Sequence, residues 1–144
     1  MKSFKISMIA LIGILLLALI SCNSGKHDKA AVTGGDALSR GKVIYERTCI
    51  ACHLVDGKGM ANSFPPLAKS DFLAKDKTQA IIQVINGKVG EMKVNGQTYN
   101  NIMPPQALND EEIADVLTYV YGSFGNDGQK VTLDEVKAVR SQLK

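Results

Sequence analysis

The sequence has little of the bulky apolar material that usually fills a protein core. It contains no tryptophan and only four phenylalanines among its 144 residues. Its length suits one domain, yet the segments with helical spacing offer few large apolar side chains. We therefore expect something other than side chains to fill part of the interior.

Cysteine is also scarce, with three residues in the whole chain. A small secreted domain stabilised by several disulfides needs more, so a disulfide scaffold is excluded. Charge indicates no particular partner, because 17 basic and 14 acidic side chains leave a formal net charge of +3 without a dense basic run. Nucleic acid is therefore not an expected partner.

The N-terminus has the pattern of an export signal. Lys2 and Lys5 precede an apolar run of 13 residues, Met8 to Ile20, whereas a membrane span needs roughly 20. The run leads into Leu-Ile-Ser-Cys, which resembles the lipobox of bacterial lipoproteins, where the cysteine is acylated. We therefore predict a signal peptide over residues 1–21, a lipidated Cys22, and a location on the periplasmic or outer face of a bacterial membrane. An uncleaved signal anchor is the alternative.

The chain after the signal divides into a tether and one folded domain. Residues 22–37 are polar, contain glycine and lack apolar periodicity, which is typical of a flexible linker. The domain is expected over residues 38–144.

Four segments of the domain have helical patterns. Leu38 to Cys52 has apolar and small residues at steps of three and four, and Thr78 to Asn86 is an apolar segment that stops at Gly87. Capping-box patterns begin two further helices: Asn109 with Glu112, and Thr132 with Glu135. The expected fold class is all-α.

Two long loops, residues 53–70 and 87–108, separate these helices. Loops of that length in a compact domain usually serve a function. Inside the second loop, Asn95-Gly96 lies between Val94 and Thr98, which predicts a small β-hairpin near residues 94–99.

Cys49, Cys52 and His53 form a Cys-x-x-Cys-His motif. A zinc site usually needs four cysteine or histidine ligands, and beyond this motif the chain has only His27 and Cys22. A redox-active dithiol usually begins a helix, whereas these cysteines end one, where the helix dipole disfavours a thiolate. Haem attachment explains the whole motif, because two cysteines bind one porphyrin and the histidine binds its iron. We therefore predict one covalently attached haem c, which would also fill the interior.

From Leu38 onward the sequence resembles the class I c-type cytochromes. The stretch LSRGKVIYERTCIACH is similar to the first helix of that family. The resemblance implies a cytochrome c fold in which Gly41 and Tyr45 pack against a later helix, at Val116 and Tyr119.

Both loops carry the resemblance further. The stretch DGKGMANSFPPLAKS is similar to the loop after the haem motif, which implies that the Pro65 carbonyl accepts a hydrogen bond from His53 and that Leu67 packs on the haem. The stretch GKVGEMKVNGQTYNNIMPPQALNDEEIADVLTYV resembles small cytochrome domains associated with bacterial copper nitrite reductases and terminal oxidases. In those domains the methionine of a Met-Pro-Pro triplet is the second iron ligand, which corresponds to Met103.

Three methionines outside the signal are candidates for this ligand. Met60 lies seven residues after His53, in a loop on the proximal side, from which the opposite haem face is hard to reach. Met92 precedes the expected turn without an obvious restraint. Met103 is followed by two prolines, which stiffen the backbone, and Pro104 also biases Met103 toward an extended conformation. Met103 is therefore the predicted ligand, and Met92 is the alternative.

These features predict a membrane-tethered monohaem electron carrier of a respiratory chain. With both axial positions filled, the iron has no open site, so we expect no enzymatic reaction and no small-molecule substrate. The expected partners are redox proteins. A haem enzyme is one alternative, and a fixed haem subunit of a terminal oxidase or nitrite reductase complex is another.

Four lysines lie in the two long loops: Lys58, Lys69, Lys88 and Lys93. They are either ordinary solvated residues or residues that steer an acidic partner toward the haem.

Overall fold

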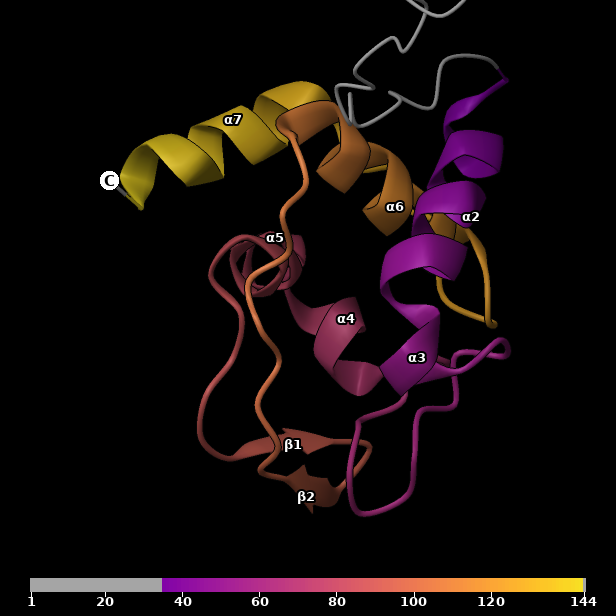
Figure 1. Cartoon of the computed structure of the whole chain (residues 1–144), viewed down its shortest axis with the longest axis vertical. Helices are drawn as coiled ribbons and strands as arrows, with labels where there is room; N and C mark the ends of the chain where they lie inside the picture. Colours follow the sequence, from indigo (N-terminus) through magenta and orange to yellow (C-terminus); the bar gives the residue numbers. More distant parts are fainter. Residues whose placement is uncertain (1–34, 144) are drawn as a thin grey trace, which may run out of the picture. The chain divides into compact units, whose positions relative to one another are not determined.

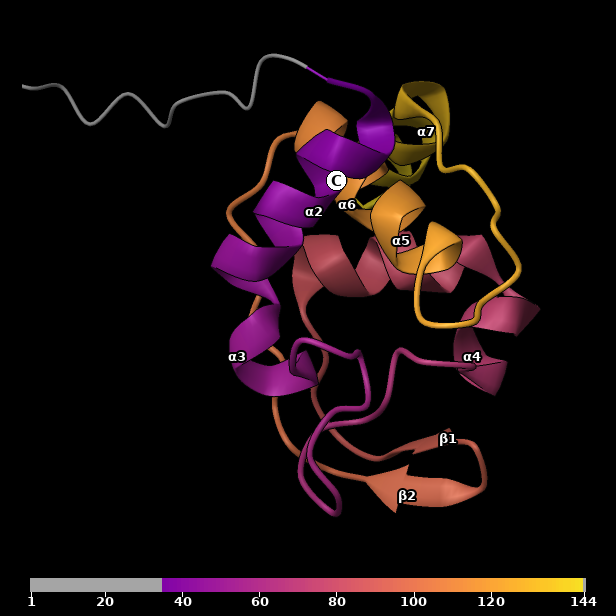
Figure 2. The same ribbon diagram turned by 90° about the vertical axis from the view of Figure 1, so that its right-hand side faces the viewer.

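The computed structural model describes residues 35–143, so the predicted signal, Cys22 and nearly all of the tether lie outside the described part. Figures 1 and 2 show a set of helices above a small hairpin. The elements are α2 (Ala37–Thr48), α3 (Ile50–His53), α4 (Asp71–Lys75), α5 (Lys77–Asn86), β1 (Met92–Val94), β2 (Gln97–Tyr99), α6 (Asp110–Gly122) and α7 (Leu133–Gln142). The expected all-α class and the hairpin are confirmed. Within residues 35–143 no helix is long and apolar enough to cross a membrane.

Helices α2 and α6 cross at very close range (Figure 1). A Cβ atom on Gly41 would lie 2.1 Å from the carbonyl oxygen of Asp115 and 2.7 Å from Cβ of Tyr119. The centroids of the Tyr45 and Tyr119 rings are 5.5 Å apart. The expected packing against Tyr119 is therefore present, and the backbone of Asp115, rather than Val116, makes the closest approach to the glycine.

Two ion pairs connect the same helices. The Arg40 guanidinium donates to both carboxylate oxygens of Asp115, at 2.6 and 2.8 Å, and Arg47 donates to Glu112 at 3.0 Å. A two-point contact between guanidinium and carboxylate fixes orientation as well as distance. The pairs therefore hold α2 and α6 in one register.

Helices α6 and α7 begin as their sequences predict. Asn109 and Glu112 exchange backbone and side-chain hydrogen bonds in a capping box at the start of α6, and Thr132 and Glu135 do so at the start of α7. Each satisfies backbone amides that a helix start leaves unpaired. The apolar stripe of α6 is buried in the core: Ile113, Val116, Leu117 and Val120.

Helices α4 and α5 form the next part of the framework. Helix α5 begins one residue before the expected segment and ends at Gly87, whose φ of 73° suits glycine. Helix α4 was not predicted, because its five residues are too few to show a helical period. The Ser70 hydroxyl caps α4 by accepting a hydrogen bond from the Leu73 amide.

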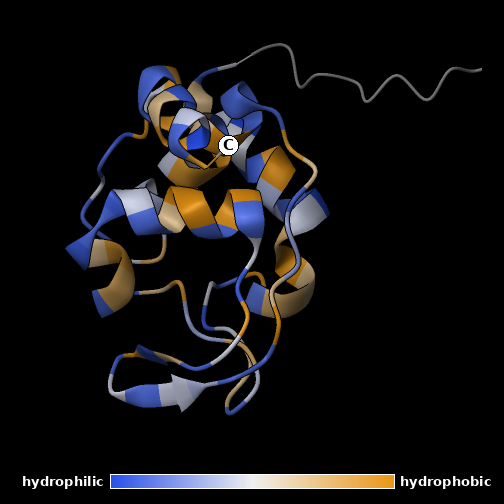
Figure 3. Ribbon diagram, turned by 90° about the vertical axis from the view of Figure 1, so that its left-hand side faces the viewer, coloured by the Kyte–Doolittle hydropathy of each residue, from blue (hydrophilic) through white to orange (hydrophobic). Residues whose placement is uncertain are grey.

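The hairpin turns at Asn95 and Gly96, which have φ values of 49° and 80°. Positive φ at both positions is the requirement of a type I′ turn. Strand β1 pairs with β2 so that Met92 faces Tyr99, and the turn is mostly hydrophilic (Figure 3). Asp71 and Asn95 exchange two hydrogen bonds between side chain and backbone, at 2.9 and 2.7 Å. This exchange fastens the hairpin to the start of α4.

Candidate cofactor-binding site

A largely apolar cavity lies between α3, α5, α6, the hairpin and the segment after the hairpin. All six residues predicted to hold or contact the haem line it: Cys49, Cys52, His53, Pro65, Leu67 and Met103. They come from three separate stretches of the chain. The fold therefore brings the two long loops and the Cys-x-x-Cys-His motif to one place.

The cysteines and the histidine lie at the end of the α2–α3 segment. Cys49 ends α2, and Cys52 and His53 belong to α3. Helix α3 stops at Leu54, which has a φ of 61°, and the Tyr45 hydroxyl donates to the Leu54 carbonyl at 2.6 Å. Burial raises the pKa of Tyr45 well above its usual value, so the hydroxyl stays protonated and remains a donor. Tyr45 therefore fixes the end of the segment that carries the motif.

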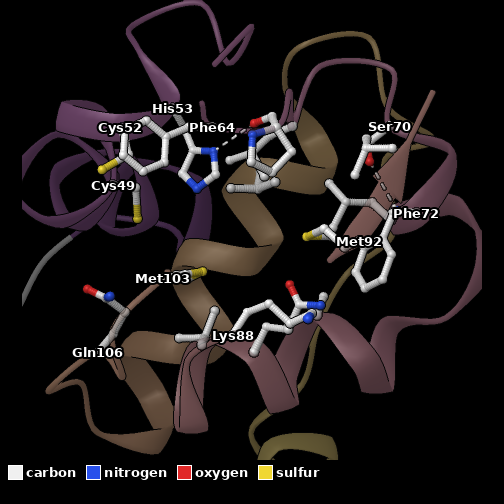
Figure 4. Close-up of a pocket in the computed structure, with 18 of the residues that line it drawn as sticks. Cys49, Cys52, His53, Phe64, Ser70, Phe72, Lys88, Met92, Met103 and Gln106 are labelled. Atoms are coloured by element: carbon white, nitrogen blue, oxygen red, sulfur yellow. Dashed lines mark hydrogen bonds between the residues drawn. The ribbon is translucent and has the colours of Figure 1, made fainter. Parts of the chain in front are cut away.

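The His53 ring is oriented by a backbone carbonyl. Its Nδ1 lies 3.1 Å from the carbonyl oxygen of Pro65 (Figure 4). Burial lowers the pKa of His53, and this outweighs the opposite effect of the hydrogen bond to Pro65. The imidazole is therefore neutral at pH 7, with Nδ1 as the donor and Nε2 free to bind a metal.

The loop that presents Pro65 depends on Gly59, which the sequence reasoning did not single out. Gly59 has a φ of 66°, and a Cβ atom there would lie 2.4 Å from the Phe64 oxygen and 2.5 Å from the Pro65 oxygen. The Gly59 amide also donates to the His53 carbonyl at 3.0 Å. A side chain at Gly59 would displace the carbonyl that orients His53.

The cysteine environment does not suit a redox dithiol. Burial raises the pKa of the Cys49 thiol to about 11, and the nearby Cys52 adds to this effect. Reactive Cys-x-x-Cys pairs need the opposite shift, because the thiolate is the nucleophile. Zinc fits no better, because among residues 35–143 no three His, Cys, Asp or Glu side chains converge to hold a metal ion.

The candidate distal ligands differ in their surroundings. Met92 and Met103 line the cavity, whereas Met60 is not among the lining residues. Figure 4 shows Met103 across the cavity from the His53 ring, and Met92 beside Phe72 and away from the cysteines. Of the two, only Met103 has the position expected of a ligand opposite His53.

The backbone of Met103 lies against the two residues that follow α5, Gly87 and Lys88. The Lys88 amide donates to the Met103 carbonyl at 2.8 Å, and the Met103 amide donates to the Lys88 carbonyl at 2.9 Å. A Cβ atom on Gly87 would lie 2.3 Å from the Met103 oxygen. Glycine is therefore required where the chain after α5 passes Met103.

This set of donors fits a haem. The histidine has its second nitrogen free, a thioether lies across the cavity, and two thiols lie near one another on one side (Figure 4). The walls between them are mainly apolar, including Phe64, Phe72 and Leu108. A flat, apolar, iron-containing ring matches both the walls and the donors.

Residues 38–123 match the cytochrome c family. The chain belongs to this family. It is 38% identical over 122 residues to cytochrome c-552 of Thermus thermophilus, an alignment that covers 76% of this chain and 81% of the relative. The cytochrome c is therefore an electron-transfer protein whose family binds haem c covalently, and the predicted family and fold are confirmed.

Two further relatives are subunits of larger assemblies. The cytochrome c is 33% identical over 116 residues to the gluconate 2-dehydrogenase cytochrome c subunit of Pantoea cypripedii, covering 76% of this chain and 26% of the relative. It is 28% identical over 106 residues to the fructose dehydrogenase cytochrome subunit of Gluconobacter japonicus, covering 70% of this chain and 22% of the relative. This chain therefore spans about a quarter of each subunit. The narrower resemblance to domains of nitrite reductases and terminal oxidases stays a prediction.

Proposed function

We propose that this cytochrome c holds one haem in the cavity and carries single electrons for a respiratory chain while tethered to a membrane. Cys49 and Cys52 would hold the haem covalently, and His53 and Met103 would be its axial ligands. The bound haem supplies the redox chemistry, a reversible one-electron change of its iron. The proposal rests chiefly on one observation: a histidine and a methionine face each other across an apolar cavity, with both cysteines on one side (Figure 4).

The surrounding residues would tune this chemistry without taking part in it. The Pro65 carbonyl holds the His53 ring in one tautomer. The Met103 thioether favours the reduced iron relative to a second nitrogen ligand. With His53 and Met103 both bound to it, the iron would keep no site for a substrate, which favours electron transfer over catalysis.

Spectroscopy of the purified protein tests the haem assignment. We expect a reduced-minus-oxidised spectrum of a c-type haem and slow or absent binding of carbon monoxide. Single Cys49→Ala and Cys52→Ala variants should each shift the pyridine haemochrome band, because one thioether is lost, and the double variant should release its haem into acid-acetone. Rapid carbon monoxide binding would instead favour a haem enzyme.

The distal ligand is tested with a matched pair of variants. Met103→Ala should lose the weak near-infrared sulfur-to-iron absorption of the ferric protein, and its reduction potential should fall. Met92→Ala removes the other methionine of the cavity wall and should keep the band. The reverse pattern would assign the ligand to Met92.

The membrane tether rests on the lipobox-like sequence at Cys22. A Cys22→Ala variant should be unprocessed or released from the membrane, and the native protein should carry the mass of an acylated N-terminal cysteine. A processed variant that stays in the membrane with otherwise normal mass would contradict the lipoprotein proposal.

A second candidate function is that of a fixed haem subunit of an oxidoreductase complex. It is favoured by the relatives that are cytochrome subunits of fructose and gluconate dehydrogenases. Mild detergent extraction followed by native sizing distinguishes the two functions. A free carrier should run at the mass of one processed chain plus detergent, whereas a subunit should run with its partners.

A further inference from the structure

Lys88 makes an unusual set of side-chain contacts beside the cavity. Its ammonium group donates to three successive carbonyls, at 2.6 Å to Val89, 3.0 Å to Gly90 and 3.3 Å to Glu91. Within residues 35–143 it forms no ion pair with a carboxylate. The charge of Lys88 is therefore directed at the backbone of the segment that follows it.

That segment has little else to hold it in place. It connects α5 to β1 without regular secondary structure, and Gly90 has a φ of 82°. The side chain of Val89 is 74% exposed, so apolar packing contributes little here. Three carbonyls that point toward one spot repel each other unless a donor lies between them. The Lys88 ammonium group supplies that donor.

The backbone of Lys88 is also the partner of Met103. The two residues form an antiparallel bridge with two hydrogen bonds. The ammonium group thus closes the turn directly after the residue that pairs with Met103. The stem of Lys88 lines the same cavity as Met103 (Figure 4).

We propose that Lys88 is a positioning residue for Met103. By gathering the carbonyls of residues 89–91, its side chain keeps its own backbone in the conformation that pairs with Met103, and so keeps the thioether directed at the iron. Without the ammonium group, the turn would open more often, and Met103 would leave the iron more often. This inference rests on the proposed function, in which Met103 is the distal ligand.

The test uses the intact holoprotein and the rate at which imidazole replaces Met103. At saturating imidazole, the rate of binding to the ferric protein is limited by release of the methionine, so it does not depend on the affinity for imidazole. Lys88→Leu keeps an apolar stem, removes the donor and adds no sulfur that could bind the iron. The net loss of about one charge-assisted hydrogen bond predicts a limiting rate about tenfold higher.

Lys93→Leu is the matched control. Lys93 is an exposed lysine of β1 whose side chain forms no ion pair among the described residues, so this variant removes the same charge from the same region without opening the turn. Its limiting rate should stay within twofold of the parent protein. Equal rates in the two variants would overturn the role of Lys88.

The Met103→Ala spectrum and the imidazole rates of the lysine variants test the ligand assignment and the role of Lys88 separately. If Met103→Ala keeps the near-infrared band, the ligand assignment fails and the role of Lys88 fails with it. If Met103→Ala loses the band but Lys88→Leu behaves like Lys93→Leu, only the role of Lys88 fails.

Discussion

The close crossing of α2 and α6 predicts that Gly41→Ala destabilises the fold. Alanine is favoured over glycine inside a helix by about 1 kcal/mol, so the substitution would stabilise an isolated helix. In the folded protein the new methyl group would lie 2.1 Å from the Asp115 carbonyl oxygen. This is backbone of a neighbouring helix, which no rotamer change can move away.

The magnitude follows from these two opposing terms. Overpacking of a core contact costs about 1–3 kcal/mol, and a contact with a fixed backbone belongs at the upper end of that range. Separating the helices would also lengthen the hydrogen bonds between Arg40 and Asp115. Subtracting the helix-propensity gain leaves a net loss of about 2 kcal/mol, or a decrease in Tm of about 10 °C.

Guanidinium unfolding of the holoprotein measures this loss, and Gly122→Ala provides the control. Gly122 is the last residue of α6, and its added Cβ would meet only Cδ2 of Leu38, at 2.8 Å. Leu38 is 45% exposed and can rotate away, so Gly122→Ala should change stability little. A Gly41→Ala protein as stable as Gly122→Ala would refute the role assigned to the crossing.

Three further substitutions test individual contacts by denaturant unfolding of the holoprotein. Tyr45→Phe removes the hydrogen bond to the Leu54 carbonyl and should lower the unfolding free energy by about 1 kcal/mol; no change would mean that the end of α3 does not depend on it. Asn109→Ala removes the cap of α6 and should cost about 1 kcal/mol, and an unchanged midpoint would show that the cap is dispensable. The hydrogen bond from Lys77 lowers the pKa of Glu135 below its usual value of 4.5, so its stabilising contribution is present above that pH and is lost as the pH falls through the lowered pKa. Glu135→Gln should therefore be slightly less stable than the parent at pH 7, and the difference should close as the pH falls through the lowered pKa. A difference that does not shrink on acidification would contradict the ionic cause.

Helix starts could be predicted from the sequence because they depend on residues three positions apart. In each capping box the two side chains accept hydrogen bonds from each other's backbone amides, so the sequence pattern alone indicates the structure. The pairs are Asn109 with Glu112 and Thr132 with Glu135. Helix α4 has only five residues and depends on a serine cap and on tertiary contacts. Its sequence carries no period that would reveal it.

The same distinction applies to the site. The Cys-x-x-Cys-His motif is local, and the resemblance pointed to Pro65 and Met103. The contacts of Lys88 were missed, because its pairing with Met103 joins residues far apart in the chain. A lysine next to a helix-ending glycine is also an ordinary surface pattern. Gly59 was missed as well, although a glycine in a loop between two functional residues is a usable signal for close backbone approach.

The positions of His53 and Met103 have a consequence for chain topology. They lie on facing sides of one cavity but 50 positions apart in sequence, so a shared iron would cross-link the chain into a closed loop. By analogy with a disulfide, closing a loop of that length lowers the entropy of the unfolded chain and so raises its free energy by about 4 kcal/mol. This cross-link is reversible on the methionine side, so the strength of one thioether bond would be linked to the stability of the whole fold. An oxidation state that binds the thioether more weakly would therefore also unfold more easily.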